Sequence, residues 1–488
     1  MRTRNAAELA KLIEAGGSSC RVVGDAEVLV GPDVVIDSRK ASSGALFVSL
    51  PGEHVDGHEY LPQAAQAGAT AAITAHEVAA APLVQLVCES AGPNPAQQGL
   101  TALARSLHAQ ARASGLLTVA ITGSSGKTST KDLLAQVLAA DGPTVSPLGS
   151  FNNELGTPLT VCQIDEGTRY LVSEMGSRAQ GDIAHLCSIV TPSASIVLNV
   201  GTAHLGEFGS REAIARAKGE IVEALDADGW AVLNADDELV DAMSARTQAH
   251  IARFTVGTAR EPEAELVVRA HDLAADDLAR FGFILTVTDP AGRDESARVQ
   301  LRVLGRHQVI DATAAATAAL ALGVPLATVV DALNRATPRS PWRMELHELP
   351  SGAAVINDAY NANPDSMSAA LRSLASIADH RRAAFPDARA IAVLGDMLEL
   401  GAGSADLHFR AGALAAELGI DEVVAIGEFA ADLAAGASQA GGRGRIVTIE
   451  SAADSLALQP GDVVLIKASR GLRLERVADQ LVAEEVAR

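Results

Sequence analysis

The residues with the clearest chemical potential form a short glycine loop between a predicted strand and a predicted helix. An apolar run at 117–121 leads into the loop, and helix-forming residues follow from Ser129 to Ala139. Glycines let backbone amides turn toward an anion, the helix N-terminus adds a partial positive charge, and a lysine and a hydroxyl can reach phosphates and Mg²⁺. This order predicts an ATP or GTP site. We expect the nucleotide to contact Gly123, Ser124, Ser125, Gly126, Lys127, Thr128 and Ser129.

The spacing of this loop departs from the common phosphate-binding motif. Two residues separate Gly123 from Gly126, whereas the common motif has about four. An ordinary strand-to-helix turn is the alternative interpretation. The Lys-Thr pair, with a strand before it and a helix after it, favours the phosphate site.

Polar side chains also follow two other predicted strands of this region. Glu174 follows the strand at 170–173, and a carboxylate there could complete a Mg²⁺ site, with a surface acid as an equal alternative. Asn234 and Asp237 follow a second strand, where they could contact a base or ribose, or begin a helix. Ligands gather at the carboxyl ends of parallel strands, so these positions are candidate site residues.

Two further residues are ambiguous when taken singly. His204 lies just beyond a strand end, and Lys218 lies on a helix predicted at 212–225. A histidine satisfied by its neighbours and a solvated lysine are the better interpretations of such isolated residues.

A third polar cluster lies at 357–366, after a predicted strand and before a predicted helix. Asp365 or Ser366 is expected to cap that helix, and the remaining hydrogen-bonding groups exceed what a turn needs. We therefore expect a binding site at this strand end, with Asn361 and Asn363 among its residues. The segments 395–401 and 467–471 occupy similar positions.

The elements that position these residues alternate between short β-branched runs and alanine-rich helical stretches, a pattern typical of α/β proteins. A chain of 488 residues suggests three domains. We expect a smaller N-terminal α/β substrate domain at 1–112, a central ATP-binding domain with a P-loop-type parallel sheet at 113–338, and a C-terminal Rossmann-like open sheet at 339–488. The polar stretch at 258–300 is predicted to form antiparallel strands.

Composition limits the partners of the chain. Lys and Arg number 39 and Asp and Glu 60, which gives a net charge of −21 and a surface that repels nucleic acid and anionic lipid. Four scattered cysteines without a C-x-x-C pair argue against a disulfide framework or a zinc site. We expect no signal peptide, no membrane insertion and no nucleic-acid partner. The expectation is a cytoplasmic monomer.

Together these motifs resemble the Mur ligase family over nearly the whole chain, and within it the MurF type. The shortened loop at 122–128 looks like the family's own phosphate loop, and 151–158 looks like its loop after the second strand. The resemblance implies an ATP- and Mg²⁺-dependent ligase that forms an acyl phosphate. D-alanyl-D-alanine would be joined to UDP-N-acetylmuramoyl-tripeptide in peptidoglycan synthesis, giving UDP-N-acetylmuramoyl-pentapeptide, ADP and phosphate.

The resemblance also implies roles for individual residues. Lys218 matches the lysine that is carbamylated in most members, a change that turns a cation into an oxygen ligand. Arg343 matches an arginine that crosses from the last domain to the ATP phosphates, and Asp358 matches an acid of that domain near the nucleotide. The implied catalytic residues are Lys127, His204, Lys218 and Arg343. The implied metal ligands are Thr128, Glu174, His204 and carbamylated Lys218.

Further matches concern the nucleotide base and the other substrates. Asn234 and Asp237 fall in the segment that holds adenine, and the segments 37–40 and 52–58 are similar to the uridine-nucleotide segment of the MurE and MurF types. The implied substrate-binding residues are Ser38, Arg39, Asp56, Asn152, Asn153, Asn361, Asn363 and Asp365.

Three alternatives stay open. A MurE-type ligase would show an Asp-Asn-Pro-Arg motif, which is absent, and the uridine-type segment argues against a folylpolyglutamate-type ligase. A non-catalytic nucleotide-binding regulatory protein would not need the metal and arginine residues that match here. Gln308 and Asp311 stand where the family usually has asparagine. The second change replaces an amide with an acid, so Asp311 receives no role.

Overall fold

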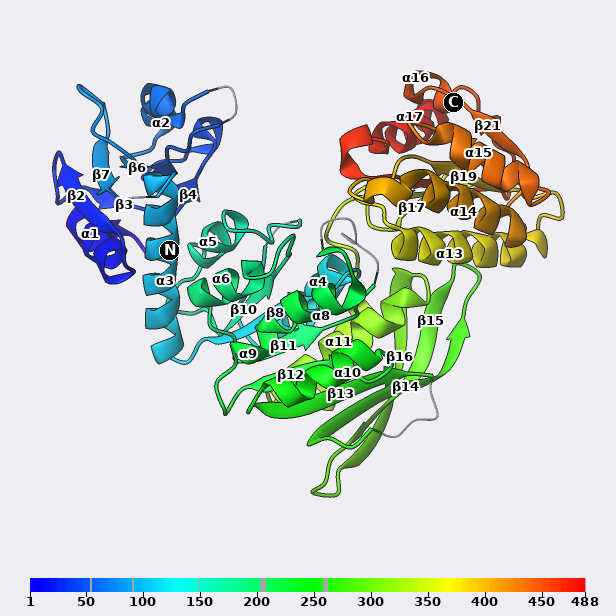
Figure 1. The fold of residues 1–488 in the computed structure, drawn as a ribbon, viewed down its shortest axis with the longest axis horizontal. Helices are drawn as coiled ribbons and strands as arrows, with labels where there is room; N and C mark the ends of the chain where they lie inside the picture. The colour runs from blue at the N-terminus through cyan, green and yellow to red at the C-terminus, as the bar shows by residue number, and fades with distance from the viewer. Residues whose placement is uncertain (53–54, 90–91, 148, 202–207, 258–261, 488) are drawn as a thin grey trace.

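The computed structural model describes residues 1–488 except 53–54, 90–91, 148, 202–207, 258–261 and 488. Three large sheets form three lobes along the chain (Figure 1), with the cyan and green central lobe between the blue N-terminal and the yellow-to-red C-terminal lobes. This arrangement confirms the predicted three-lobed α/β class. The domain limits given above stay a proposal.

The N-terminal lobe is built on a five-stranded sheet with the order β2-β7-β6-β5-β4. All neighbours are parallel except β2 and β7. Helix α1 (Ala6–Ala15) begins where the Asn5 side chain accepts a hydrogen bond from the Glu8 amide, an interaction that satisfies a free N–H at the helix start. The strands are β2 Ser19–Val23, β4 Val34–Val35, β5 Leu46–Val48, β6 Ala71–Thr74 and β7 Val84–Glu89.

The long helix α3 (Pro95–Ala113) joins the first lobe to the second. Its buried Leu100, Leu103 and Leu107 belong to one hydrophobic cluster with residues of α1 and of the central sheet. Each fully buried leucine contributes about 1.5–3 kcal/mol. The two lobes therefore share a continuous core.

The central lobe is built on a nine-stranded sheet with the order β16-β15-β14-β13-β12-β11-β8-β10-β9. Neighbours from β9 to β14 are parallel, and β14, β15 and β16 are antiparallel, which confirms the prediction for 258–300 where residues are described. The strands are β8 Leu117–Thr122, β9 Thr144–Val145, β10 Tyr170–Glu174, β11 Ala194–Val197, β12 Trp230–Asn234, β13 His250–Val256, β14 Leu266–Ala275, β15 Arg280–Thr288 and β16 Asp294–Leu304.

One face of this sheet is covered by α4 (Lys127–Ala139) and the alanine-rich α11 (His307–Ala321), whose buried residues share a cluster with β8 and β13. Helix α4 begins at Lys127, two positions before the predicted start. Helices α5 (Gly156–Val161) and α6 (Asp182–Ile189) bury residues in the cluster that also contains α3.

The helix predicted at 212–225 is divided into α8 (Arg211–Lys218) and α9 (Glu220–Glu223). Arg246 donates hydrogen bonds to the carbonyls of Ala215 and Arg216 at the end of α8. A Cβ at Gly219 would lie 1.8 Å from the Arg246 guanidinium. Arg246 therefore contacts the carbonyls near the end of α8, whose last residue is Lys218.

The C-terminal lobe has a six-stranded sheet with the order β17-β18-β22-β19-β20-β21. Only β17 is antiparallel to its neighbour, which confirms a mainly parallel open sheet. Helices α13 (Pro364–Arg382), α14 (Ser404–Glu417) and α15 (Ala430–Gln439) pack on one face, and α17 (Glu475–Ala487) packs on the other. The strands are β17 Glu345–Glu348, β18 Ala354–Asp358, β19 Ala390–Leu394, β20 Glu422–Ala425, β21 Gly444–Ile446 and β22 Val463–Lys467.

Helix α13 begins differently from the prediction. Its N-cap is Asn363, whose side chain accepts from the Ser366 amide while the Ser366 hydroxyl accepts from the Asn363 amide. The expectation that Asp365 or Ser366 would be the N-cap residue was therefore wrong, although the Ser366 side chain completes the capping box. Pro364, which has no N–H to satisfy, occupies the first helical position.

Within the part of the chain that the structure describes, no helix has the length and apolarity needed to cross a membrane. All four cysteines are buried free thiols.

Candidate active site

The phosphate loop lies between β8 and α4, as predicted. Gly126 has a φ of 82°, and a Cβ at this position would lie 2.4 Å from Asp311 Oδ1. Both the left-handed backbone and the space therefore require glycine here. The Lys127 ammonium folds back to donate 2.8 Å to the Gly123 carbonyl. Burial lowers the pKa of Lys127, with Glu174 opposing that shift and Arg343 adding to it.

Asn199 is a site residue that the sequence analysis missed. Its Oδ1 accepts hydrogen bonds of 3.0 Å from the amides of both Ser124 and Ser125. An anion that used these two amides would have to displace the Asn199 oxygen. The available signal was its position just after β11, as a polar residue between the apolar Leu198 and Val200.

A chain of hydroxyls and a carboxylate begins beside the loop. The Thr128 and Ser150 hydroxyls lie 3.0 Å apart, and Ser150 donates to Glu174 Oε1 at 2.9 Å. Asn152 donates to the same carboxylate oxygen at 2.8 Å. Glu174 Oε2 is buried and has no hydrogen-bond partner. A buried carboxylate oxygen without a partner is costly, which makes it the strongest structural sign of an absent ligand here.

This donor set fits Mg²⁺. Thr128 Oγ1 and Glu174 Oε2 are hard oxygen donors, and Mg²⁺ usually takes one or two protein carboxylates and leaves other positions to phosphates and water. Among the described residues, no group of three or more His, Cys, Asp or Glu side chains is placed to hold a metal ion. The predicted ligand His204 lies outside the described residues.

Lys218, at the end of α8, is 4% exposed and lines one cavity together with Thr128 and Glu174. Burial lowers the pKa of its ammonium well below the ordinary value, and the charge of Lys127 lowers it further. A lysine with a lowered pKa has a larger neutral, nucleophilic fraction. Its environment is therefore suited to covalent modification of the amine.

Arg343 brings the C-terminal lobe to the phosphate loop. Its Nη2 donates 3.3 Å to Thr128 Oγ1, and its guanidinium lies 4.2 Å from the centre of the Tyr360 ring. The residues on either side, Trp342 and Met344, have φ values of 60° and 51°. Such conformations are uncommon for bulky residues and persist only where surrounding contacts hold them.

These groups line one cavity of about 810 Å³ between the central and C-terminal lobes. Ser177, whose buried hydroxyl has no hydrogen-bond partner, also lines it and was missed from the sequence. The predicted site residues in its lining are Ser124, Ser125, Gly126, Lys127, Thr128, Ser129, Asn152, Asn153, Glu174, Lys218, Arg343, Asn361 and Asn363.

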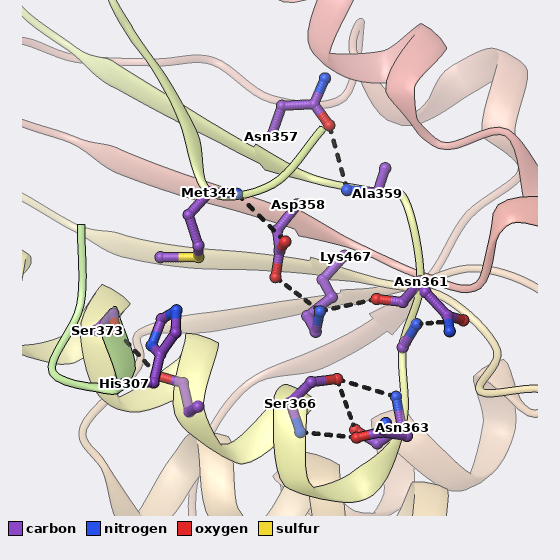
Figure 2. A network of polar contacts seen from close by, with 12 residues as sticks. His307, Met344, Asn357, Asp358, Ala359, Asn361, Asn363, Ser366, Ser373 and Lys467 are labelled. Atoms are coloured by element: carbon purple, nitrogen blue, oxygen red, sulfur yellow. Dashed lines mark hydrogen bonds and ion pairs between the residues drawn. The ribbon is translucent and has the colours of Figure 1, made fainter. Parts of the chain in front are cut away.

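Asp358 lies behind this cavity in a buried network (Figure 2). Its Oδ2 accepts 2.6 Å from Lys467 Nζ, and its Oδ1 accepts 3.2 Å from the Met344 amide. Lys467 also donates 2.9 Å to the Asn361 carbonyl. Burial lowers the pKa of Lys467, and Asp358 opposes that shift. Both carboxylate oxygens of Asp358 are therefore already engaged, one with Lys467 and the other with the backbone next to Arg343.

Asp365 and Asn153 each have a structural contact. A Cβ at Gly201 would lie 2.2 Å from an Asp365 carboxylate oxygen, so α13 meets the central lobe there. The side-chain Oδ1 of Asn153 accepts from the Leu155 and Gly156 amides at the start of α5.

Asn234 and Asp237 do not line the cavity. The side-chain Nδ2 of Asn234 donates 2.8 Å to the Leu198 carbonyl. Asp237 caps the four-residue helix α10 (Glu238–Asp241) and also accepts from the Val200 amide. The helix-capping interpretation therefore describes the contacts of Asp237.

The predicted uridine-site residues lie in the N-terminal lobe, around α2 (Leu61–Ala67). The Ser38 hydroxyl donates 2.8 Å to the Gln63 side chain on this helix. Arg39 pairs with Asp37, which holds the pKa of that carboxyl at about 2. Asp56 lies 2.6 Å from His58 Nδ1, just before α2. Residues 53–54 of the predicted segment lie outside the described residues.

Asp311, which received no role from the sequence, lies under the phosphate loop. Its Oδ1 accepts 3.1 Å from the Thr130 hydroxyl, and its buried Oδ2 has no partner. Burial raises the pKa of this carboxyl to about 8, and Thr130 and Arg343 oppose the shift. Gln308, the other departure, is buried with its Oε1 unpartnered.

The fold and the cavity define a multidomain α/β protein in which a phosphate-loop lobe and a second open-sheet lobe share one site. Three family models match the chain: the catalytic domain of the Mur ligase family at 33–115, the Mur ligase middle domain at 121–319, and the Mur ligase glutamate ligase domain at 342–470. The chain belongs to the Mur ligase family.

Named relatives agree with this assignment. The chain is 42% identical to a UDP-N-acetylmuramoyl-tripeptide–D-alanyl-D-alanine ligase of Mycobacterium tuberculosis, with 93% of this chain and 92% of that protein covered. A Bacillus subtilis protein of the same name is 32% identical, with 92% and 93% covered.

Solved structures are similar over most of the chain. Crystal structure I of MurF from Acinetobacter baumannii has a TM-score of 0.82 at 29% identity and covers 99% of both chains. The MurF ligase of Thermotoga maritima in complex with ADP has a TM-score of 0.72 at 27% identity, with 93% of this chain and 98% of that chain covered.

Proposed function

We propose that this enzyme joins D-alanyl-D-alanine to UDP-N-acetylmuramoyl-tripeptide and converts ATP to ADP and phosphate. The names of its relatives support this reaction. The observation that carries the proposal is the single cavity in which Lys127, Glu174, Lys218 and Arg343 meet. A phosphate loop and an opposing arginine are the parts that phosphoryl transfer requires.

In the proposed reaction, a carboxylate oxygen of the tripeptide attacks the γ-phosphorus of ATP, and the bond to ADP breaks. The D-alanyl-D-alanine amine then attacks the acyl carbon of the acyl phosphate, releasing phosphate and a proton. Lys127 and Arg343, which line the same cavity, neutralise charge on the transferred phosphoryl group. Asp358 and Lys467 fix the backbone from which Arg343 reaches across.

Thr128 and Glu174 would hold Mg²⁺, and we propose His204 and carbamylated Lys218 as ligands of a second ion. The metal would supply positive charge beside the phosphoryl oxygens. Carbamylation forms a bond between Lys218 Nζ and the carbon of CO₂ and releases one proton. The lowered pKa of Lys218 favours this step, because only the neutral amine is nucleophilic.

The remaining predicted residues would contact the other substrates. We assign the uridine nucleotide to the N-terminal lobe around Ser38, Arg39 and Asp56, and adenine to the segment of Asn234 and Asp237. The two peptides would be positioned by the cavity wall, which contains Asn152, Asn153, Asn361 and Asn363, and by Asp365 nearby. Asn361, Asn363 and Asp365 belong to the C-terminal lobe, which supports binding of the D-alanyl-D-alanine amine at that lobe.

Phosphate release tests this function directly. The enzyme is mixed with ATP, Mg²⁺ and a UDP-N-acetylmuramoyl-tripeptide, with or without D-alanyl-D-alanine, and both phosphate and the pentapeptide product are measured. We expect both to depend on the two peptides together. Release that ignores D-alanyl-D-alanine, or the absence of pentapeptide, contradicts the proposal. Glutamate in place of D-alanyl-D-alanine is the control for a folylpolyglutamate-type acceptor.

A further inference from the structure

Lys131 is a buried lysine one turn beyond Thr128 on α4, and the reaction above assigns it no role. Its side chain is 2% exposed and forms a 2.6 Å ion pair with Asp132. Its ammonium donates 2.9 Å to the Pro147 carbonyl, 3.0 Å to the Gly149 carbonyl and 3.3 Å to the Ser340 hydroxyl. An ammonium has three N–H donors, so the three hydrogen bonds to Pro147, Gly149 and Ser340 use all of them.

The first set of contacts leads to the candidate metal ligands. The Gly149 carbonyl immediately precedes Ser150, whose hydroxyl connects Thr128 to Glu174. Lys131 therefore fixes the backbone that sets the position of this hydroxyl.

The second set leads to Arg343. Ser340 donates its amide to Asp132 Oδ2 at 2.8 Å while its hydroxyl accepts from Lys131. Farther along α4, Gln136 exchanges two hydrogen bonds with the backbone of Thr337. The linker to the C-terminal lobe thus follows α4 until three residues before Arg343.

We propose that Lys131 is a positioning residue for the ligase reaction proposed above. One ammonium places Ser150 beside Glu174 and, through Ser340, places Arg343 beside Thr128. Burying a charge is costly, and a well-packed apolar residue would fill this space without that cost. The buried charge of Lys131 instead makes contacts that lead both to the oxygens of the candidate metal ligands and to Arg343.

The test uses the double variant Lys131→Met/Asp132→Asn, which removes the ion pair without leaving an unpaired buried charge. Asparagine at 132 can still accept from the Ser340 amide. Gln136→Ala is the matched control, because Gln136 contacts the linker and not the segment before Ser150. We measure kcat, the KM of each substrate, the Mg²⁺ concentration for half-maximal activity, and the melting temperature.

We expect the double variant to lose about 10–100-fold in kcat and to need several-fold more Mg²⁺, as changes behind metal ligands commonly do. The KM of the UDP substrate should stay within about twofold, because its proposed site lies in the N-terminal lobe. Gln136→Ala should keep the wild-type Mg²⁺ requirement. An unchanged Mg²⁺ requirement in the double variant, or an equal rise in both variants, overturns the proposal.

If the double variant melts below the assay temperature, Lys131→Gln/Asp132→Asn replaces it. The glutamine amide can still donate to the Pro147 or Gly149 carbonyl, so the Mg²⁺ requirement should rise less. Mg²⁺-dependent ADP binding is measured by calorimetry on every variant, since it needs no turnover. A wild type that binds ADP but forms no pentapeptide contradicts the proposed function alone. Equal Mg²⁺ dependence of ADP binding in all variants contradicts the role of Lys131.

Discussion

Arg343 Nη2 donates a hydrogen bond of 3.3 Å to Thr128 Oγ1, across 215 positions of sequence. The Ser150 hydroxyl donates its hydrogen bond to Glu174, so Thr128, which accepts from Arg343, donates to Ser150. A directed chain of polar contacts therefore runs from the C-terminal lobe to the candidate metal ligand. We expect a substrate that moves Arg343 to disturb the oxygens of Thr128 and Ser150 as well.

Arg343→Ala should lower kcat by about 10²–10³-fold, the usual loss when one charge-stabilising donor is removed from a transition state. The KM of the UDP substrate should change little. Arg339→Ala is the control, since Arg339 is exposed in the same linker. Steady-state kinetics with detection of the pentapeptide measures kcat and KM for both variants. Equal losses in the two variants would show that linker charge, not contact with the phosphates, is what matters.

Lys218→Ala should lose most activity and regain part of it when a small carboxylate such as acetate is added. The truncated side chain leaves space in the cavity where a carboxylate can take the place of the carbamate oxygens. Lys11→Ala, an exposed position on α1, should keep full activity and ignore acetate. Full activity of Lys218→Ala would show that the carbamate is not needed.

The phosphate loop, Glu174 and the polar strand ends were visible in the sequence because each follows an apolar run and belongs to a short local pattern. The sheet then brings them to one edge, as the rule for parallel strands predicts. Helix starts were less certain: Asn363 and Asp365 are both good capping residues, and only the folded backbone distinguishes them.

Contacts between distant segments could not be predicted. Asn199 was hidden in an apolar strand pattern, and its bonds to Ser124 and Ser125 depend on the neighbouring strand. The contacts of Arg246 with the end of α8 are equally hidden, because no local pattern connects Arg246 to that helix. Lys131 appears as one more helical lysine until Ser340 is placed against it.

Asn199→Asp should weaken ADP binding by about tenfold, which corresponds to about 1.4 kcal/mol. A carboxylate would hold the Ser124 and Ser125 amides more strongly than the amide oxygen does and would repel the phosphates. Asn153→Asp adds the same charge to the cavity, away from these amides, and its oxygen can still accept from Leu155 and Gly156. Calorimetry that finds equal weakening in both would point to general charge repulsion.

Asp311 should make the stability of the protein depend on pH. Its pKa is raised to about 8 in the folded protein and is about 3.9 when unfolded. Between these values the folded state keeps a proton that the unfolded state has lost. The free energy of unfolding should therefore fall as pH rises from about 4 to about 8, by at most about 1.4 kcal/mol per pH unit, and level off above that.

Asp311→Asn removes this proton while keeping the shape of the side chain and an oxygen that can accept from Thr130. Its stability relative to wild type should therefore increase between pH 5.5 and 8, measured by chemical denaturation at about half-unit intervals. Asp289→Asn, at a half-buried acid far along the chain from the phosphate loop, is the control and should follow the wild-type curve. Burial is the main cause of the raised pKa of Asp311. A difference in the free energy of unfolding between Asp311→Asn and wild type that stays constant across this range would contradict that raised pKa. It would mean that Asp311 is already ionised at low pH in the folded protein. The phosphate loop would then rest on a charged carboxylate under Gly126, and ADP binding should strengthen in Asp311→Asn at every pH.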